Sequence, residues 1–133
     1  MTSGRLAGVR VLLVDDHADT AETLALALRA AGADVQMATM ARDALEAMKS
    51  FRPHVLVSDL AMPVVDGYAL IEKVRSLPQG QGSKVPALAV TAHAYPPLLE
   101  RSLRMGFNAW LAKPVEPDAL IDAVARLAKT AVP

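Results

Sequence analysis

Residues 54–67 read HVLVSDLAMPVVDG, and this stretch decides the fold of the chain. Its apolar run, VLV, leads to a single acid, Asp59, and the turn pair Asp66-Gly67 follows. Short runs of β-branched and aliphatic residues between turn signals are typical of a strand that is buried on both faces. An acid at the carboxyl end of such a strand lies where open α/β sheets bind their ligands. Asp59 is therefore the first candidate functional residue.

Further apolar runs predict four more strands, and segments with apolar residues at helical spacing separate them. The predicted strands are residues 9–14, 33–38, 55–59, 87–90 and 109–112. The helical patterns lie between residues 21 and 31, 41 and 48, 70 and 77, 96 and 105, and 120 and 127. Strict alternation of strands and helices predicts a doubly wound α/β fold, with a parallel sheet covered by helices on both faces.

The chain of 133 residues is long enough to bury the core of one domain. Residues 1–8 are small and polar, which predicts a flexible lead-in. The domain is predicted over residues 9–129, and residues 130–133 form a short tail.

Composition excludes several classes of function. Lysine plus arginine equals aspartate plus glutamate, 14 each, so nothing indicates a basic surface for nucleic acid or an anionic membrane. No uncharged stretch is long and apolar enough to span a bilayer. Cysteine is absent, which excludes disulfides, thiolate nucleophiles and cysteine-rich zinc sites and suits a cytoplasmic protein.

Functional side chains follow four of the five predicted strands: Asp15-Asp16, Asp59, Thr91 and Lys113. In a parallel sheet the carboxyl ends of all strands lie at one edge, so these groups should converge. Carboxylates held close together repel one another and favour a hard divalent cation such as Mg²⁺, or Mn²⁺ in its place. A lysine and a hydroxyl beside that cation would bind a phosphoryl group. The pattern predicts phosphoryl transfer to the Asp59 carboxylate.

Each of these residues also has an ordinary structural explanation. Asp15 or Asp16 could cap the first helix, and Thr91 could cap another. Asp59 could be a loop carboxylate, and Lys113 could be a solvated surface charge. Their coincidence at four strand ends favours the functional interpretation.

The remaining polar candidates carry less information. His17, His54 and His93 show no paired metal-ligand spacing, and we interpret His54 as structural. Trp110 is interpreted as a packing residue, although it lies close to Lys113 in the sequence.

In this order, the motifs resemble those of response-regulator receiver domains, such as the chemotaxis regulators, over roughly residues 9–129. The matching segments are VLLVDD (11–16), VLVSDLAMPVVDG (55–67), ALAVTA (87–92) and AWLAKP (109–114). The resemblance implies a flavodoxin-like sheet of five parallel strands in the order 2-1-3-4-5, with five helices.

The resemblance also implies a role for each matching residue. Asp59 would be the phosphoacceptor, and it would bind Mg²⁺ together with Asp15, Asp16 and the backbone carbonyl of Ala61. The residues two positions after Asp59 and Thr91, Ala61 and His93, would set the lifetime of the phosphoryl group.

On the fourth and fifth strands, Thr91 and Lys113 would contact the phosphoryl oxygens. The Lys113–Pro114 peptide bond is a candidate cis bond. Phosphorylation would draw the Thr91 hydroxyl toward the phosphoryl group and let Trp110 rotate inward into the space behind it, a switch biased by local electrostatics.

The family's phosphoryl donors are histidine kinases and histidine phosphotransfer proteins. The switch would change the face formed by residues 96–105, 109–112 and 117–127 for an unknown downstream protein, or for a second copy in a homodimer. Such a domain is not an enzyme in the usual sense, because it catalyses only its own phosphorylation and dephosphorylation. The amino-acid sequence around the motifs resembles that of receivers in hybrid histidine kinases, and a single-domain regulator is the alternative.

Two other functions compete with this interpretation. A phosphorylation-independent interaction module could keep the fold, although such chains usually lose an acid or the lysine. A Mg²⁺-dependent phosphatase with an aspartyl-phosphate intermediate would need a second acid two residues after the nucleophile, where this chain has Ala61.

Overall fold

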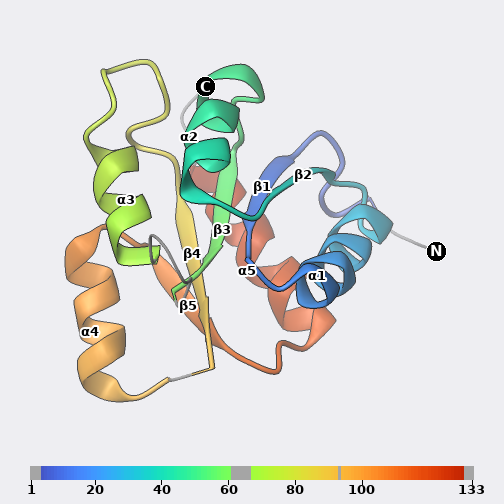
Figure 1. Ribbon diagram of the computed structural model, residues 1–133. Coiled ribbons are helices and arrows are strands. Elements are labelled where there is room, and N and C mark those ends of the chain that lie inside the picture. The colour runs from blue at the N-terminus through green and yellow to red at the C-terminus, as the bar shows by residue number, and fades with distance from the viewer. Residues whose placement is uncertain (1–3, 61–66, 93, 131–133) are drawn as a thin grey trace.

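The computed structural model describes residues 4–60, 67–92 and 94–130, which form five strands and five helices in strict alternation (Figure 1). The strands are β1 (Arg10–Val14), β2 (Asp34–Ala38), β3 (Val55–Asp59), β4 (Ala87–Thr91) and β5 (Ala109–Ala112). The helices are α1 (Ala18–Ala30), α2 (Ala41–Ser50), α3 (Gly67–Arg75), α4 (Pro96–Met105) and α5 (Pro117–Thr130). The strands pair in parallel in the order β2-β1-β3-β4-β5, which confirms the predicted fold class and topology.

Each face of the sheet has its own hydrophobic core. Helices α1 and α5 cover one face, and α2, α3 and α4 cover the other (Figure 1). The central strands β3 and β4 are buried at every position because helices cover both of their faces, which is why their apolar runs, VLV and ALAV, do not alternate with polar residues. The two layers of helices leave the ends of the strands as the sites where polar groups can gather.

The segment before β1 belongs partly to the core. Leu6 is fully buried, and its backbone N–H donates to the carbonyl of Ala31 at the end of α1. The prediction of a flexible lead-in over residues 1–8 is therefore wrong at Leu6, which packs with the apolar residues of α1 and α5. None of the helices in the described ranges is long and apolar enough to cross a membrane.

Arg75, the last residue of α3, forms hydrogen bonds to two loops at the amino edge of the sheet. Its guanidinium donates to the carbonyls of Ser83, Val85 and Gly106, and to Oδ1 of Asn108. Five hydrogen bonds of 2.6–3.1 Å use all of its N–H groups. Burial lowers the pKa of Arg75 from its usual value, because the surroundings disfavour the charged form.

His54 joins the beginnings of β1 and β3. Its Nδ1 accepts a hydrogen bond of 2.9 Å from the backbone N–H of Arg10, and the backbone N–H of His54 donates to the Arg10 carbonyl. The imidazole accepts at Nδ1, so in this arrangement it is the neutral tautomer with its proton on Nε2. Burial, with a smaller contribution from the Arg10 charge, lowers the pKa of His54. The structural interpretation of His54 agrees with these contacts.

This arrangement predicts a pH-dependent stability. Below about pH 6.5, the ordinary imidazole value, the unfolded chain binds a proton at His54 that the folded chain does not bind. The free energy of unfolding should therefore fall as the pH falls, through the window between the two pKa values. His54→Asn keeps an acceptor near the Nδ1 position without the titration, so its stability should depend less steeply on pH. Urea unfolding of both proteins between about pH 5 and pH 8 measures the slopes, and parallel slopes would contradict the assignment.

Candidate functional site

Three carboxylates gather at the carboxyl edge of the sheet, where the sequence predicts them. Val14 of β1 pairs with Ser58 of β3, so Asp15 and Asp59, which follow them, lie side by side on neighbouring strands. Both side chains are buried, with exposed fractions of 2% for Asp15 and 5% for Asp59. Asp16 follows Asp15 and is partly buried, and carboxylate oxygens of all three residues lie within 4.8 Å of one another.

Lys113 reaches this cluster from β5, across the intervening strand β4. Its Nζ lies 3.3 Å from Oδ2 of Asp15 and 3.2 Å from Oδ2 of Asp59. Burial alone would lower the pKa of Lys113, but the charges of Asp59 and Asp15 outweigh it and raise that pKa above its usual value. The ammonium therefore stays charged and offsets part of the repulsion between the two carboxylates.

The loop after β5 holds Lys113 in place. The backbone N–H of Lys113 donates to the carbonyl of Thr91 at 2.8 Å, which fixes the end of β5 against the end of β4. The Lys113–Pro114 peptide bond is cis, as the resemblance implies. Thr91 itself is the last residue of β4 and is 1% exposed, one position beyond the pairing of Asp59 with Val90. The structure thus brings Thr91 to the same edge as Asp59.

His17 is a member of the cluster that the sequence analysis missed. Its Nδ1 lies 3.4 Å from Oδ1 of Asp15 and 3.2 Å from Oδ1 of Asp16. Its backbone N–H also donates to Oδ1 of Asp15 at 2.9 Å. The sequence shows no paired metal-ligand spacing for His17, but in the folded chain Asp15, Asp16, His17 and Asp59 each offer a ligand atom within 4.8 Å of the others. Adjacency to the acid pair was the signal in the sequence.

The residues present fit a divalent cation. Oδ1 of Asp16 is buried and accepts no hydrogen bond from any described residue, although His17 Nδ1 lies 3.2 Å away. A buried carboxylate oxygen without a hydrogen bond is costly unless a cation satisfies it. Three carboxylates are an oxygen-rich set of the kind that Mg²⁺ prefers. The backbone carbonyl of Ala61, the fourth expected ligand, lies outside the described residues, as does His93.

Glycine at position 67 allows a close approach between the start of α3 and the end of β3. The Gly67 N–H donates to the carbonyl of Leu60 at 2.9 Å, and α3 begins at this residue. A Cβ at this position would meet the backbone carbonyl of Asp59 and lie 2.7 Å from the Cα of Leu60. The close approach leaves no room for a side chain, so glycine at this position lets α3 begin directly against the end of β3.

Trp110, interpreted from the sequence as a packing residue, is partly exposed. It lies on β5 opposite Ala89, and 39% of its surface is exposed. Two other large apolar side chains are exposed on the neighbouring element α4 and at its start, Leu103 and Tyr95. Exposed large apolar side chains therefore occur on β5, on α4 and just before α4.

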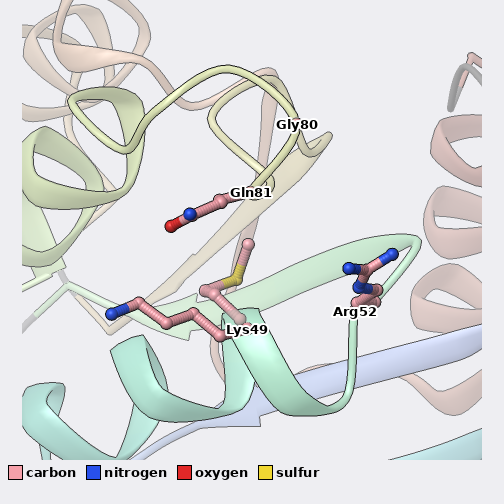
Figure 2. Close-up of a pocket in the computed structure, with 5 residues that line it drawn as sticks. Lys49, Arg52, Gly80 and Gln81 are labelled. Carbon is pink, nitrogen blue, oxygen red and sulfur yellow. The ribbon is translucent and has the colours of Figure 1, made fainter.

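A pocket of about 130 Å³ lies far from the carboxylates (Figure 2). It is formed between the end of α2 and the loop that leads into β4, and it is lined by Met48, Lys49, Arg52, Gly80 and Gln81. These segments precede β3 and β4 in the chain, so the pocket is at the amino edge of the sheet. The candidate chemistry is at the opposite edge, and we assign this pocket no role in it.

Comparison with known proteins gives a consistent result. The family model of the response regulator receiver domain matches residues 11–125 of this chain. An uncharacterised 14.6 kDa protein of Leptolyngbya boryana is 44% identical over 119 residues, covering 90% of this chain and 89% of that protein. The sensor histidine kinase RcsC of Salmonella typhi is 35% identical over 115 residues, which cover 86% of this chain and 12% of the kinase.

Two solved structures have the same fold. A putative response regulator from Chloroflexus aurantiacus superposes with a TM-score of 0.85 at 34% identity, covering 91% of this chain and 98% of that chain. The receiver domain of a sensor histidine kinase from Pseudomonas aeruginosa superposes with a TM-score of 0.82 at 30% identity, covering 92% and 99%. That domain was solved with a magnesium ion coordinated in its active site cleft.

Proposed function

The chain belongs to the response regulator receiver domain family of two-component signalling, and from this premise we propose that it accepts a phosphoryl group on Asp59 in a Mg²⁺-dependent reaction. The observation that carries the proposal is the contact of Lys113 with both Asp59 and Asp15 at the carboxyl edge of the sheet. It places a fixed positive charge beside the proposed nucleophile.

The proposed reaction uses this chain's residues in separate roles. A carboxylate oxygen of Asp59 attacks the phosphorus of the donor, and the bond from phosphorus to the donor breaks with its electron pair leaving on the donor. Lys113 exchanges its contact with the Asp59 carboxylate for one with a phosphoryl oxygen, and the Thr91 hydroxyl donates to another. Mg²⁺, bound by Asp15, Asp16, Asp59 and the carbonyl of Ala61, would neutralise charge on the phosphoryl oxygens.

We propose that the donor is a histidine kinase or a histidine phosphotransfer protein, by analogy with the kinases among its relatives. Receivers of both stand-alone and kinase-linked type share this fold, so the chain acts either as a single-domain regulator or as the receiver of a hybrid kinase. Ala61 and His93, two residues after Asp59 and Thr91, would set how long the phosphoryl group survives.

The proposed output is a change in the α4–β5–α5 face. Drawing Thr91 toward the phosphoryl group would alter the end of β4, to which Lys113 and β5 are bonded. Trp110, which is 39% exposed on β5, would then rotate inward and change the apolar surface that this face presents to a downstream protein or to a second copy.

The experiment that tests the function is intact-mass analysis after treatment with acetyl phosphate. In Mg²⁺ we expect a single phosphoryl adduct, and in EDTA we expect none, because three carboxylates and a phosphoryl group cannot lie together without a cation. Trp110 is the only tryptophan, so its fluorescence reports the switch in the same samples. Equal labelling with and without Mg²⁺ would contradict the metal dependence. The absence of any adduct, with no fluorescence response to beryllofluoride, would favour a phosphorylation-independent interaction module.

A further inference from the structure

His17 adds a fourth candidate metal ligand to the three carboxylates. Among the described residues of this cluster, its imidazole is the one nitrogen ligand. Its Nδ1 is 3.4 Å and 3.2 Å from single oxygens of Asp15 and Asp16. No described residue donates a hydrogen bond to that oxygen of Asp16, which leaves it available to a cation shared with the imidazole. Lys113 contacts the other oxygen of Asp15 and one oxygen of Asp59, so it does not occupy the side of the cluster that His17 faces.

From this geometry we propose that His17 is a fourth ligand, which lets the site bind a divalent transition ion of the imidazole-preferring class as well as Mg²⁺. The inference rests on the proposed function in that both use the same three carboxylates. Mg²⁺ and Mn²⁺ are suited to carboxylate oxygens, whereas Zn²⁺, Ni²⁺ and Fe²⁺ are also suited to imidazole. A mixed set of three carboxylates and one imidazole therefore shifts the preference of the site toward those ions.

His17 is free to act as a ligand without disturbing the fold. It occupies the N-terminal cap position of α1, but its side chain makes no capping hydrogen bond. Two-thirds of that side chain is exposed, 66%, so the ring can adjust around an ion at the mouth of the cluster.

An alternative role for His17 predicts the opposite sign. If the imidazole were only a positive charge paired with Asp15 and Asp16, it would compete with every divalent cation. Its removal would then raise the affinity for Mg²⁺ and for a transition ion together. If it is a ligand, its removal lowers the affinity for the transition ion selectively.

Calorimetric titration with NiCl₂ and with MgCl₂, on protein without a histidine tag, distinguishes these roles. His17→Phe keeps a ring of similar size without a donor atom, and His17→Ala provides a second variant should the first fold poorly. Both should bind Ni²⁺ at least about tenfold more weakly than the wild type and bind Mg²⁺ nearly unchanged. His54→Asn, which removes a histidine at the opposite edge of the sheet, is the matched control and should bind both ions as the wild type does.

Two outcomes overturn the proposal: unchanged Ni²⁺ affinity in both His17 variants, or a rise in affinity for both ions. Its failure is distinguishable from that of the proposed function, because Ni²⁺ binding requires no phosphoryl transfer. A wild-type protein that binds Ni²⁺ through His17 but gains no adduct from acetyl phosphate would contradict only the proposed function. A protein that is phosphorylated in Mg²⁺ but binds Ni²⁺ equally well with or without His17 would contradict only this inference.

Discussion

Asp59→Asn should abolish the phosphoryl adduct that acetyl phosphate forms on the wild-type protein. Asparagine has the same shape as aspartate, but its neutral amide is not a nucleophile toward phosphorus at neutral pH. Its oxygen can still accept the hydrogen bond that Lys113 donates to Asp59 in the wild type. The substitution also removes one of three neighbouring negative charges, so we expect the variant to remain folded.

The measurement is intact-mass analysis of wild type and variant, followed by peptide mapping of any adduct. Asp34→Asn is the matched control: it makes the same chemical change on an exposed residue of β2 and should be labelled as the wild type is. An adduct that survives in Asp59→Asn would place the phosphoacceptor at another residue. Equal loss of labelling in Asp34→Asn would show that the effect is not specific to the site.

Arg75→Met should destabilise the fold more than any surface substitution, by about 2–4 kcal/mol. Methionine keeps most of the length of the side chain but removes all five of the hydrogen bonds that Arg75 donates. The carbonyls of Val85 and Gly106, which accept at 2.6 and 2.7 Å, would lose charged donors in a place that is partly closed to water. The connection from α3 to the beginnings of β4 and β5 would weaken.

Urea unfolding of Arg75→Met gives the change in the free energy of unfolding. Arg104→Met is the control, because Arg104 makes only an exposed pair with Glu100 four residues earlier, and such pairs contribute about 0.3–0.5 kcal/mol. Since Arg75 lies at the amino edge of the sheet, the folded variant should still be phosphorylated on Asp59. A loss of less than about 1 kcal/mol would show that water replaces the guanidinium without cost.

The sequence by itself determined the elements, their order and the residues of the carboxyl edge. The apolar runs before Asp15, Asp59, Thr91 and Lys113 predict strands, and alternation with helices predicts that those strands are parallel. Parallel strands end at one edge, so the sequence alone assigns four residues that are distant in the chain to one site. The helix from Pro96 was predicted with its observed bounds, because proline favours its start and Gly106 its end.

Other features depend on packing between segments that are far apart in the chain, and local patterns do not contain them. Leu6 is buried only because the turn before β1 folds against the end of α1. Trp110 is exposed because its side of β5, at the edge of the sheet, is not covered as the central strands are. A hydrophobic residue in an apolar run is predicted to be buried whether or not a neighbour covers it.

The cluster of candidate metal ligands was likewise predicted only in part from the sequence. The acids were predicted from their positions at strand ends, but His17 was not, because the direction of a side chain after a strand is decided by the turn into α1. The acceptors of Arg75 lie 8 to 33 residues away, and Lys113 contacts residues 54 and 98 positions earlier. Sequence periodicity specifies which face a residue occupies, whereas only the tertiary structure decides which distant groups meet there, because those contacts follow from how the helices and loops pack onto the sheet.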